Sequence, residues 1–255
     1  MALHIEKYGL QSKQALTLIH GWGMHSGVWQ PILRRLTAHY CVHCVDLPGM
    51  GLSETISPYT LANISAEVST LLAEKTHILG WSLGGQVAMQ LALDTPDKIG
   101  KLVLVGATPK FTSTDDWPCG VLLQNLEKFG LDVERDYRAT MLKFLSLQCM
   151  GAANMKDTVR ILREAFALKP APNMVSLKQA LTILETNDLR AQLQYIQTQT
   201  LILHGEKDGL SPIGAGEYLA ENIQSSQFVR FPNASHAPFL SHLNEFMQSL
   251  NQFLQ

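Results

Sequence analysis

A serine flanked by glycines stands where a predicted strand gives way to a predicted helix. Ser82 lies in the run Gly80–Gly85, directly after the apolar residues 76–81 and just before a helical pattern over 83–94. Glycines on both sides allow a sharp turn that holds a serine hydroxyl exposed at the end of the strand. The Leu83 amide at the helix start is free to stabilise developing negative charge. Ser82 is therefore the candidate nucleophile, and Leu83 is one candidate oxyanion donor.

A serine hydroxyl needs a base, and His236 is the best placed of the nine histidines. It lies in the turn-forming run 233–238, between a predicted strand and the last predicted helix. His242, at the start of that helix, is the competing candidate. His204 ends a predicted strand and is expected to be packed in the core.

The acid that would orient this histidine is expected after the serine and before the histidine in the chain. Asp208 meets that condition in the loop 205–209, directly after the predicted strand 199–204. Its carboxylate would accept the Nδ1–H of the imidazole, fix the tautomer and stabilise the imidazolium. Glu206 and Asp188 remain alternatives.

A second oxyanion donor is expected from the loop after the first long strand. His20-Gly21-Trp22-Gly23 follows the predicted strand 15–20, and glycines let this loop fold back toward the serine. The Trp22 amide is therefore the second candidate. The run 46–53 contains G-x-G without the rest of a dinucleotide fingerprint, so we interpret it as a structural loop beside the site.

The elements that position these residues alternate between strand and helix. Short apolar runs predict strands covered on both faces, as in a parallel sheet, over 15–20, 40–46, 76–81, 100–106, 199–204 and 226–231. Helical patterns fall between or after them over 61–74, 83–94, 213–223 and 243–254. This alternation predicts the α/β class, with a doubly wound, mostly parallel sheet.

The alternation stops near residue 108 and resumes near residue 198. The intervening segment contains no convincing strand and predicts helices over 121–129, 133–147, 154–168 and 173–185. A helical block inserted there is expected to cover the carboxyl ends of the strands, where ligands of α/β proteins bind. We therefore expect a core made of 1–107 and 199–255, with 108–198 as a helical cap.

Composition excludes several other classes of protein. The 20 lysine and arginine residues nearly balance 22 aspartate and glutamate residues, which argues against a generic nucleic-acid binder. The uncharged run 76–93 is interrupted by glycines and glutamines, so it predicts a buried strand and helix instead of a membrane span. No secretory signal is visible, and Cys41 and Cys44 are expected to be buried and reduced in a strand. We expect a cytoplasmic monomer without metal or cofactor.

Five blocks of the chain together resemble the α/β-hydrolase fold family. They are HGWG (20–23), DLPGMGLS (46–53), GWSLGG (80–85), HGEKDGLSP (204–212) and NASHAPF (233–239). More narrowly, the chain is similar to the carboxylesterases that act on pimeloyl-acyl-carrier-protein methyl ester in biotin synthesis. Trp81 and the segments 115–120, 144–151 and 184–190 carry this narrower resemblance.

The resemblance implies a mechanism and a substrate channel. Ser82 would attack the methyl ester, His236 would take its proton, and the amides of Trp22 and Leu83 would hold the oxyanion. Methanol would leave, and water would then hydrolyse the acyl-enzyme. The channel residues implied by the resemblance are Phe144, Leu145, Ser146, Leu147 and Gln148.

The resemblance also implies an acidic carrier protein as partner, and the sequence offers a basic surface for it. Residues 137–170 contain six lysines and arginines against two acidic residues. Lys156, Arg160 and Arg163 recur at helical spacing, which places them on one face of a helix. A solvated helix face without a partner is the alternative.

The match to the family's carrier contacts is incomplete. Where the family has arginines, this chain has lysine at Lys143 and Lys156 and alanine at Ala139. Lysine offers a point charge without the two-pronged fork of arginine. A general short-chain esterase, a carbon–carbon hydrolase or a haloperoxidase would use much the same catalytic residues, so these activities remain open. A binding protein on an inactive scaffold would lack one of the three catalytic residues, and all three are present.

Overall fold

The computed structural model describes residues 3–72 and 74–255. Residues 1 and 2, at the start of the predicted core segment 1–107, lie outside the described residues. So does residue 73, near the end of the predicted helix 61–74.

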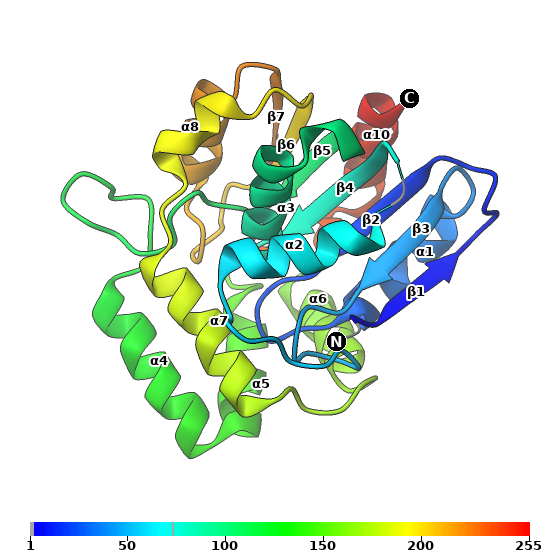
Figure 1. Cartoon of the computed structure of the whole chain (residues 1–255). Helices are drawn as coiled ribbons and strands as arrows, with labels where there is room; N and C mark the ends of the chain where they lie inside the picture. The colour runs from blue at the N-terminus through cyan, green and yellow to red at the C-terminus, as the bar shows by residue number, and fades with distance from the viewer. Residues whose placement is uncertain (1–2, 73) are drawn as a thin grey trace.

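A seven-stranded sheet forms the centre of the described chain (Figure 1). The strands lie side by side in the order β1, β3, β2, β4, β5, β6 and β7. β1 pairs antiparallel with β3, and the other neighbours run parallel. The strand bounds are β1 Ile5–Tyr8, β2 Ala15–Ile19, β3 Cys41–Val45, β4 Thr76–Trp81, β5 Ile99–Val105, β6 Thr200–Gly205 and β7 Ser226–Phe231.

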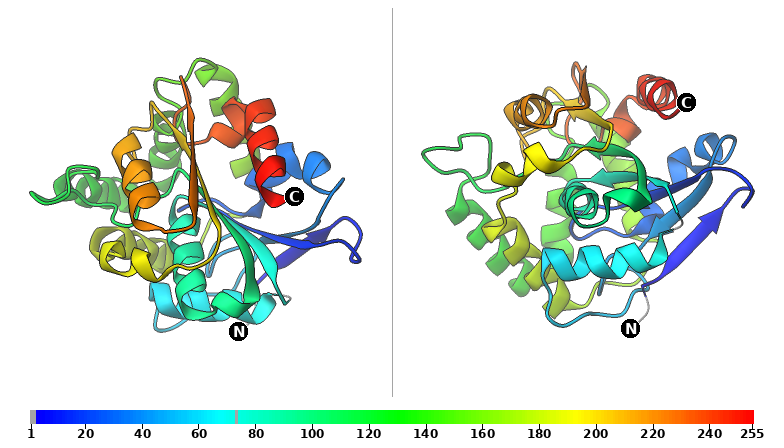
Figure 2. Two further views of the ribbon diagram at one scale, coloured as in Figure 1. Left: turned by 90° about the horizontal axis from the view of Figure 1, so that it is seen from above. Right: turned by 45° about the horizontal axis from the view of Figure 1, so that its top comes forward.

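Helices cover both faces of this sheet (Figure 2). Ile78 and Leu79, consecutive in β4, pack into two different apolar clusters, because side chains alternate across a strand. The cluster around Ile78 contains side chains of α2 (Leu61–Leu71), α3 (Leu83–Asp94) and α8 (Ile213–Asn222). The cluster around Leu79 contains those of α1 (Gln30–Leu36), α9 (Pro238–Ser241) and α10 (Leu243–Leu254). The predicted doubly wound α/β fold is confirmed.

The parallel strands end together at one edge of the sheet. Ile19 lies opposite Gly80, Trp81 lies opposite Val105, and Val105 lies opposite Leu203. The loops that follow β2, β4, β5 and β6 therefore begin at this edge. This register is what brings residues from distant parts of the sequence to one place.

Four helices lie between β5 and β6 in the chain. They are α4 (Leu123–Arg135), α5 (Tyr137–Leu147), α6 (Met155–Phe166) and α7 (Met174–Thr186). The expected helix over 133–147 is wrong at its start, since α4 continues to Arg135 and the chain breaks at Asp136. Asp136 has φ −150° and its carboxylate accepts the Ala139 N–H, which starts α5.

β1, α1 and α9 had no counterpart in the sequence-based assignment. β1 is a four-residue edge strand that is only partly buried, so it has no apolar run to mark it. α1 follows the short 3₁₀ turn Ser26–Trp29 and is seven residues long. The uncharged run 76–93 forms β4 and α3, and no helix in the described part of the chain is long and apolar enough to cross a membrane. Cys41 and Cys44 are buried and free, as expected.

Lys169, in the loop after α6, links the inserted segment to the sheet. Its Nζ lies 2.6 Å from a Glu6 carboxylate oxygen, 2.6 Å from Ser26 Oγ and 2.9 Å from Asp46 Oδ2. The side chain of Lys169 is 9% exposed and that of Asp46 is fully buried. Burial alone would raise the pKa of Asp46, but interactions with His20, Lys169 and backbone amides outweigh it and hold the pKa at about 2. The carboxylate is therefore charged, and it needs its cation.

Replacing Lys169 with methionine should lower the free energy of unfolding by about 3 kcal/mol, because Asp46 would keep a buried charge without its partner. The matched control is Lys178→Met, which breaks the pair with Glu134. The side chains of that pair are 70% and 48% exposed, so solvent screens the pair and the expected loss is much smaller. Urea unfolding at pH 7 measures both values, and equal losses in the two variants would contradict the assignment.

The same pair predicts a pH dependence. The pKa of Asp46 is about 2 in the folded protein, against about 3.9 in an unfolded chain. Its contribution to stability is thus complete above pH ~4 and is lost as the pH falls toward ~2. The difference in free energy of unfolding between wild type and Lys169→Met should therefore become smaller as the pH falls from ~4 to ~2. A difference that stayed constant would show that another group causes the loss.

Candidate active site

Ser82 occupies a backbone conformation that non-glycine residues seldom adopt. Its φ is 57° and its ψ is −118°, and it caps the start of α3. Its N–H donates to the Val105 carbonyl at 3.0 Å, which ties the turn to the end of β5. The turn has no room for larger neighbours, since a Cβ on Gly80 would lie 2.2 Å from the Gly84 carbonyl oxygen. The serine itself is partly exposed, as a nucleophile must be.

His236 and Asp208 form a buried hydrogen-bonded pair. His236 Nδ1 lies 2.7 Å from Asp208 Oδ2, and the two side chains are 2% and 0% exposed. The other carboxylate oxygen of Asp208 accepts the N–H groups of Leu210 and Ser211, each at 2.9 Å. Burial acts to raise the pKa of Asp208, but His236, His204 and backbone amides outweigh it, so the net pKa lies below the ordinary value. Asp208 is therefore held as a carboxylate.

The backbone of His236 is fixed from two sides. Its N–H donates to the Gln148 carbonyl at 3.0 Å, and its own carbonyl accepts the Trp81 Nε1–H at 2.8 Å. Trp81 directly precedes Ser82, so one indole connects the serine turn to the histidine loop. A Cβ on Gly106 would lie 3.0 Å from the His236 carbonyl and 3.3 Å from Asp208 Oδ2. Gly106 comes directly after Val105, whose carbonyl accepts the Ser82 N–H. Ser82, His236 and Asp208 therefore all lie near the end of β5.

None of the alternative residues replaces His236 or Asp208 in this pair, although His204 Nε2 lies 3.6 Å from Asp208 Oδ2. His242 contacts Ser241 Oγ at 2.9 Å, and His204 is fully buried with its Nε2 2.6 Å from the Ser211 carbonyl. Glu206 is exposed, and Asp188 pairs with Arg190. Within the described residues, no group of three or more histidine, cysteine or acidic side chains is arranged to hold a metal ion.

His20 controls the loop that carries Trp22. The Leu47 N–H donates to His20 Nε2 at 2.9 Å, so the ring proton is on Nδ1, which then donates to the Gly21 carbonyl at 2.8 Å. Burial lowers the pKa of His20 to about 4, which keeps the ring neutral near pH 7. Gly21 O and Trp22 N belong to one planar peptide unit, so this bond fixes where the Trp22 N–H points. Gly21 also lies against the serine, since a Cβ there would be 3.2 Å from Ser82 Cβ.

Trp22, Phe129 and Phe144 form an aromatic cluster beside a cavity of about 230 Å³. The Trp22 ring lies 5.3 Å from Phe129 and 5.6 Å from Phe144, centroid to centroid. The cavity continues to Gly209 and Leu210, next to Asp208. The rest of its wall is apolar except for one amide: Phe111, Val121, Asn125, Leu126, Leu147, Leu181 and Leu184.

The five residues of the expected substrate channel are not placed alike. Phe144 and Leu147 line the cavity, whereas Leu145 is fully buried in the apolar cluster shared with α9 and α10. Ser146 donates to the Leu142 carbonyl. Gln148 is 1% exposed, and neither its Nε2 nor its Oε1 has a hydrogen-bond partner among the described residues.

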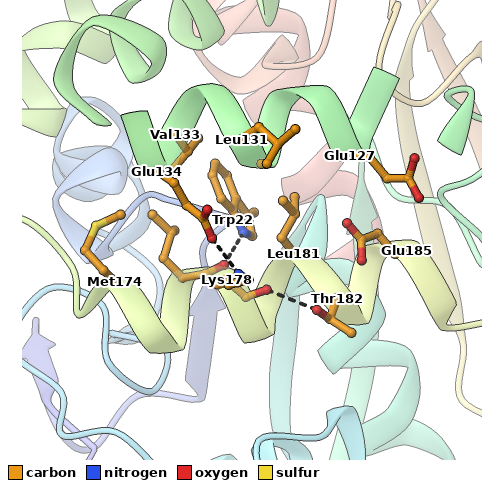
Figure 3. Close-up of a pocket in the computed structure, with 12 residues that line it drawn as sticks. Trp22, Glu127, Leu131, Val133, Glu134, Met174, Lys178, Leu181, Thr182 and Glu185 are labelled. Carbon is orange, nitrogen blue, oxygen red and sulfur yellow. Dashed lines mark hydrogen bonds and ion pairs between the residues drawn. The ribbon is translucent and has the colours of Figure 1, made fainter. Parts of the chain in front are cut away.

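A second hollow, of about 390 Å³, was not anticipated from the sequence. It lies between α4 and α7, with the Trp22 indole at its floor (Figure 3). The indole N–H donates to the Leu177 carbonyl at 3.0 Å, and Lys178 bridges to Glu134 on the facing helix at 2.5 Å. No spacing in the sequence brings α4 and α7 together, because they are separated by two other helices.

Comparison with known proteins identifies the family to which this fold belongs. The family model for the α/β hydrolase fold matches residues 14–243. The chain belongs to the α/β-hydrolase family. Among its relatives is a protein of Nitrosomonas europaea named pimeloyl-(acyl-carrier protein) methyl ester esterase. It is 37% identical to this chain, over 96% of this chain and 97% of the relative. The one in Aeromonas salmonicida is 38% identical, over the full length of both chains.

Solved structures agree with this membership. An esterase from Exiguobacterium antarcticum superposes with a TM-score of 0.90 at 25% identity, covering 98% of this chain and 94% of its own. A bromoperoxidase from Bacillus anthracis gives a TM-score of 0.89 at 24% identity, covering 99% and 95%, and shares the fold. The family resemblance seen in the sequence is therefore confirmed.

Gly106→Ala should reduce hydrolysis of a p-nitrophenyl ester by about 100-fold, because the added Cβ displaces His236 and Asp208 from the turn and misplacement by about 1 Å has costs of that order. The native φ of +50° adds strain to any side chain there. Gly151→Ala is the matched control, since its φ of +84° imposes a similar strain while a Cβ there meets nothing closer than Lys207 Cβ, at 3.3 Å. Steady-state kinetics on both variants test this prediction. Full activity in Gly106→Ala would mean that the His236–Asp208 pair does not depend on its close packing against Gly106.

Proposed function

We propose that this protein is a serine carboxylesterase that hydrolyses the methyl ester of pimeloyl-acyl-carrier protein. The products are methanol and a carrier-bound pimeloyl group with a free distal carboxylate, the step that biotin synthesis requires. The single observation that carries the proposal is the buried Asp208–His236 pair beside the Ser82 turn, in a chain whose full length matches relatives with that name.

The chemistry follows from the three side chains. His236 Nε2 takes the proton from Ser82 Oγ as that oxygen attacks the ester carbonyl. The Asp208 carboxylate keeps the proton of Nδ1 in place and stabilises the imidazolium that forms. The same proton then passes to the leaving methoxide oxygen, and methanol departs. Water, activated in turn by His236, attacks the acyl-enzyme and releases the carboxylate.

The oxyanion would be held by the N–H groups of Leu83 and Trp22. Leu83 is the first residue of α3, so its N–H has no acceptor within the helix, and the helix dipole favours negative charge there. Trp22 would supply the second donor from the loop after β2, whose Gly21 lies against Ser82. His20 acts as a positioning residue, because it holds the other end of the Gly21–Trp22 peptide. Donors fixed before the reaction need no reorganisation as charge develops.

The acyl chain would lie in the cavity lined by Phe144 and Leu147. Its walls are apolar enough for a methylene chain, and it reaches Gly209 beside the catalytic carboxylate. Gln148 offers a side-chain amide without an internal partner, and its own backbone carbonyl accepts the His236 N–H. We further propose that the segment 108–198 serves as the cap of a core made of 1–107 and 199–255.

The carrier protein would dock on a basic surface formed by Lys143 of α5 and by Lys156, Arg160 and Arg163 of α6. All four side chains are exposed, and α5 and α6 pack against each other. Lys169, which the sequence grouped with them, is withdrawn into its contacts with Glu6 and Asp46. An acidic partner would be steered to this surface by its charge.

Ser82→Ala should abolish ester hydrolysis, because it removes the attacking oxygen. Asp208→Asn should lower the rate by about 10⁴-fold, since the amide cannot accept the imidazole proton and favours the wrong tautomer. Initial rates with the carrier-bound methyl ester measure both, with thermal melts to verify that each variant is folded. Near-normal turnover by Ser82→Ala would refute the proposed nucleophile.

Reversing Lys143, Lys156 and Arg160 together to glutamate should raise KM for the carrier-bound ester by tenfold or more, about 1.4 kcal/mol, with little change for a p-nitrophenyl ester. Lys7, Arg34 and Arg230 are exposed cations elsewhere, and their triple reversal is the charge-matched control. Side-by-side kinetics on the two substrates test the proposal. Equal effects on both would refute docking at this surface, and a wild type active on small esters alone would favour a general esterase.

A further inference from the structure

A pocket of about 340 Å³ lies between the inserted helices and the loop that carries Trp22. We call it the α5–α6 pocket. Its wall combines residues of α5, of α6, of the loop after α6 and of the loop after β2: Gly23, Met24, His25, Gly51, Tyr137, Arg138, Leu142, Arg163, Phe166, Ala167, Lys169, Pro170, Ala171 and Pro172. The wall contains three permanent cations and no acidic side chain.

Two of those cations have no acidic partner among the described residues. Lys169 is saturated, because Glu6, Ser26 and Asp46 take its three N–H groups. Arg138 and Arg163 are exposed, and over residues 3–72 and 74–255 no carboxylate oxygen lies within 4.0 Å of either guanidinium. Arg163 Nη2 also donates to Ser146 Oγ at 3.3 Å. The remaining guanidinium N–H groups of the two arginines offer the planar donor geometry that suits phosphate and carboxylate groups.

The other wall residues indicate what kind of molecule would carry the anionic group. The Tyr137 hydroxyl is buried without a hydrogen-bond partner among the described residues. His25 is not free to bind, because its Nδ1 accepts the Gly27 N–H and its Nε2 contacts the Phe166 carbonyl. Most of what remains is apolar, including Met24 and Leu142. The occupant should therefore be an anion attached to an uncharged, partly apolar chain.

The position of the pocket relates it to the two ends of the proposed reaction path. Arg163 belongs both to the pocket and to the basic surface proposed for the carrier protein. Gly23, which also lines the pocket, is the residue after the proposed oxyanion donor Trp22.

We propose that the α5–α6 pocket binds a phosphate ester through Arg138 and Arg163, with the buried Tyr137 hydroxyl as a further donor. The inference rests on the proposed function for its source, which is the phosphate of the pantetheine arm by which a carrier protein holds its acyl group. A free phosphorylated metabolite has the same chemistry and is the second possible source. The pocket would then recognise the arm independently of the acyl group at Ser82.

The first test is binding, which does not require turnover. Calorimetric titration of the wild type should show 4′-phosphopantetheine binding at least tenfold more tightly than pantetheine, because only the former offers the phosphate. Arg138→Gln/Arg163→Gln should remove that preference and leave pantetheine binding as it was. Lys128→Gln/Arg135→Gln, which removes the same charge from α4 and the groove beside it, should keep the preference.

The second test identifies the source. If kcat/KM for the carrier-bound methyl ester falls in Arg138→Gln, which leaves the proposed docking residue Arg163 intact, in step with phosphopantetheine affinity, the phosphate is that of the carrier's arm. If affinity falls and kcat/KM does not, the site serves a free phosphate ester, and inorganic phosphate should then compete for it. Equal binding of the two probes by the wild type, or loss of the preference in the α4 variant instead, would overturn the proposal. A wild type that binds the phosphate but does not hydrolyse the carrier ester would refute the proposed function alone.

Discussion

The whole site depends on the backbone of Ser82, which is held at φ 57° between β4 and α3. Such a conformation costs a non-glycine residue about 1–3 kcal/mol, so the surroundings must impose it. They do so through the bond from Ser82 N–H to the Val105 carbonyl and through glycines packed against backbone on both sides. The same geometry projects the hydroxyl away from the sheet and leaves the Leu83 amide free. One strained residue therefore positions both the proposed nucleophile and one of the proposed oxyanion donors.

Each neighbouring loop is fixed by one buried polar side chain, and each of these side chains finds its partners. His20 serves the loop after β2, Asp46 the loop after β3, and Asp208 the loop after β6. Each bonds a backbone group of its own or an adjacent loop. A buried polar group without a partner costs about 1–3 kcal/mol, so these bonds strongly disfavour other loop conformations. This is how loops at the edge of a sheet become as rigid as the strands beneath them.

Local patterns made most of this fold and the candidate site predictable. Buried parallel strands are continuous apolar runs, and each candidate catalytic residue follows directly after one of them. The sequence could not predict β1, because a partly exposed edge strand has no apolar run. Nor could it place Lys169, since a lysine in a charged segment normally points to solvent and only the folded chain brings Glu6 and Asp46 beside it. The helix break at Asp136 was missed because the apolar pattern continues on both sides of it.

The Lys169 contact has a consequence for the chemistry, since it begins a continuous chain of bonds that ends at the oxyanion loop. Lys169 holds Asp46, the Leu47 N–H that follows holds His20, and His20 holds the Gly21 carbonyl. Trp22 closes the connection from the other side, because its indole packs on Phe129 and Phe144 and bonds the Leu177 carbonyl. The inserted segment is thus linked to the Gly21 carbonyl through the bonds that begin at Lys169, and it contacts the Trp22 indole directly. The position of the inserted helices and the orientation of the Trp22 peptide, the proposed oxyanion donor, are therefore connected through these contacts.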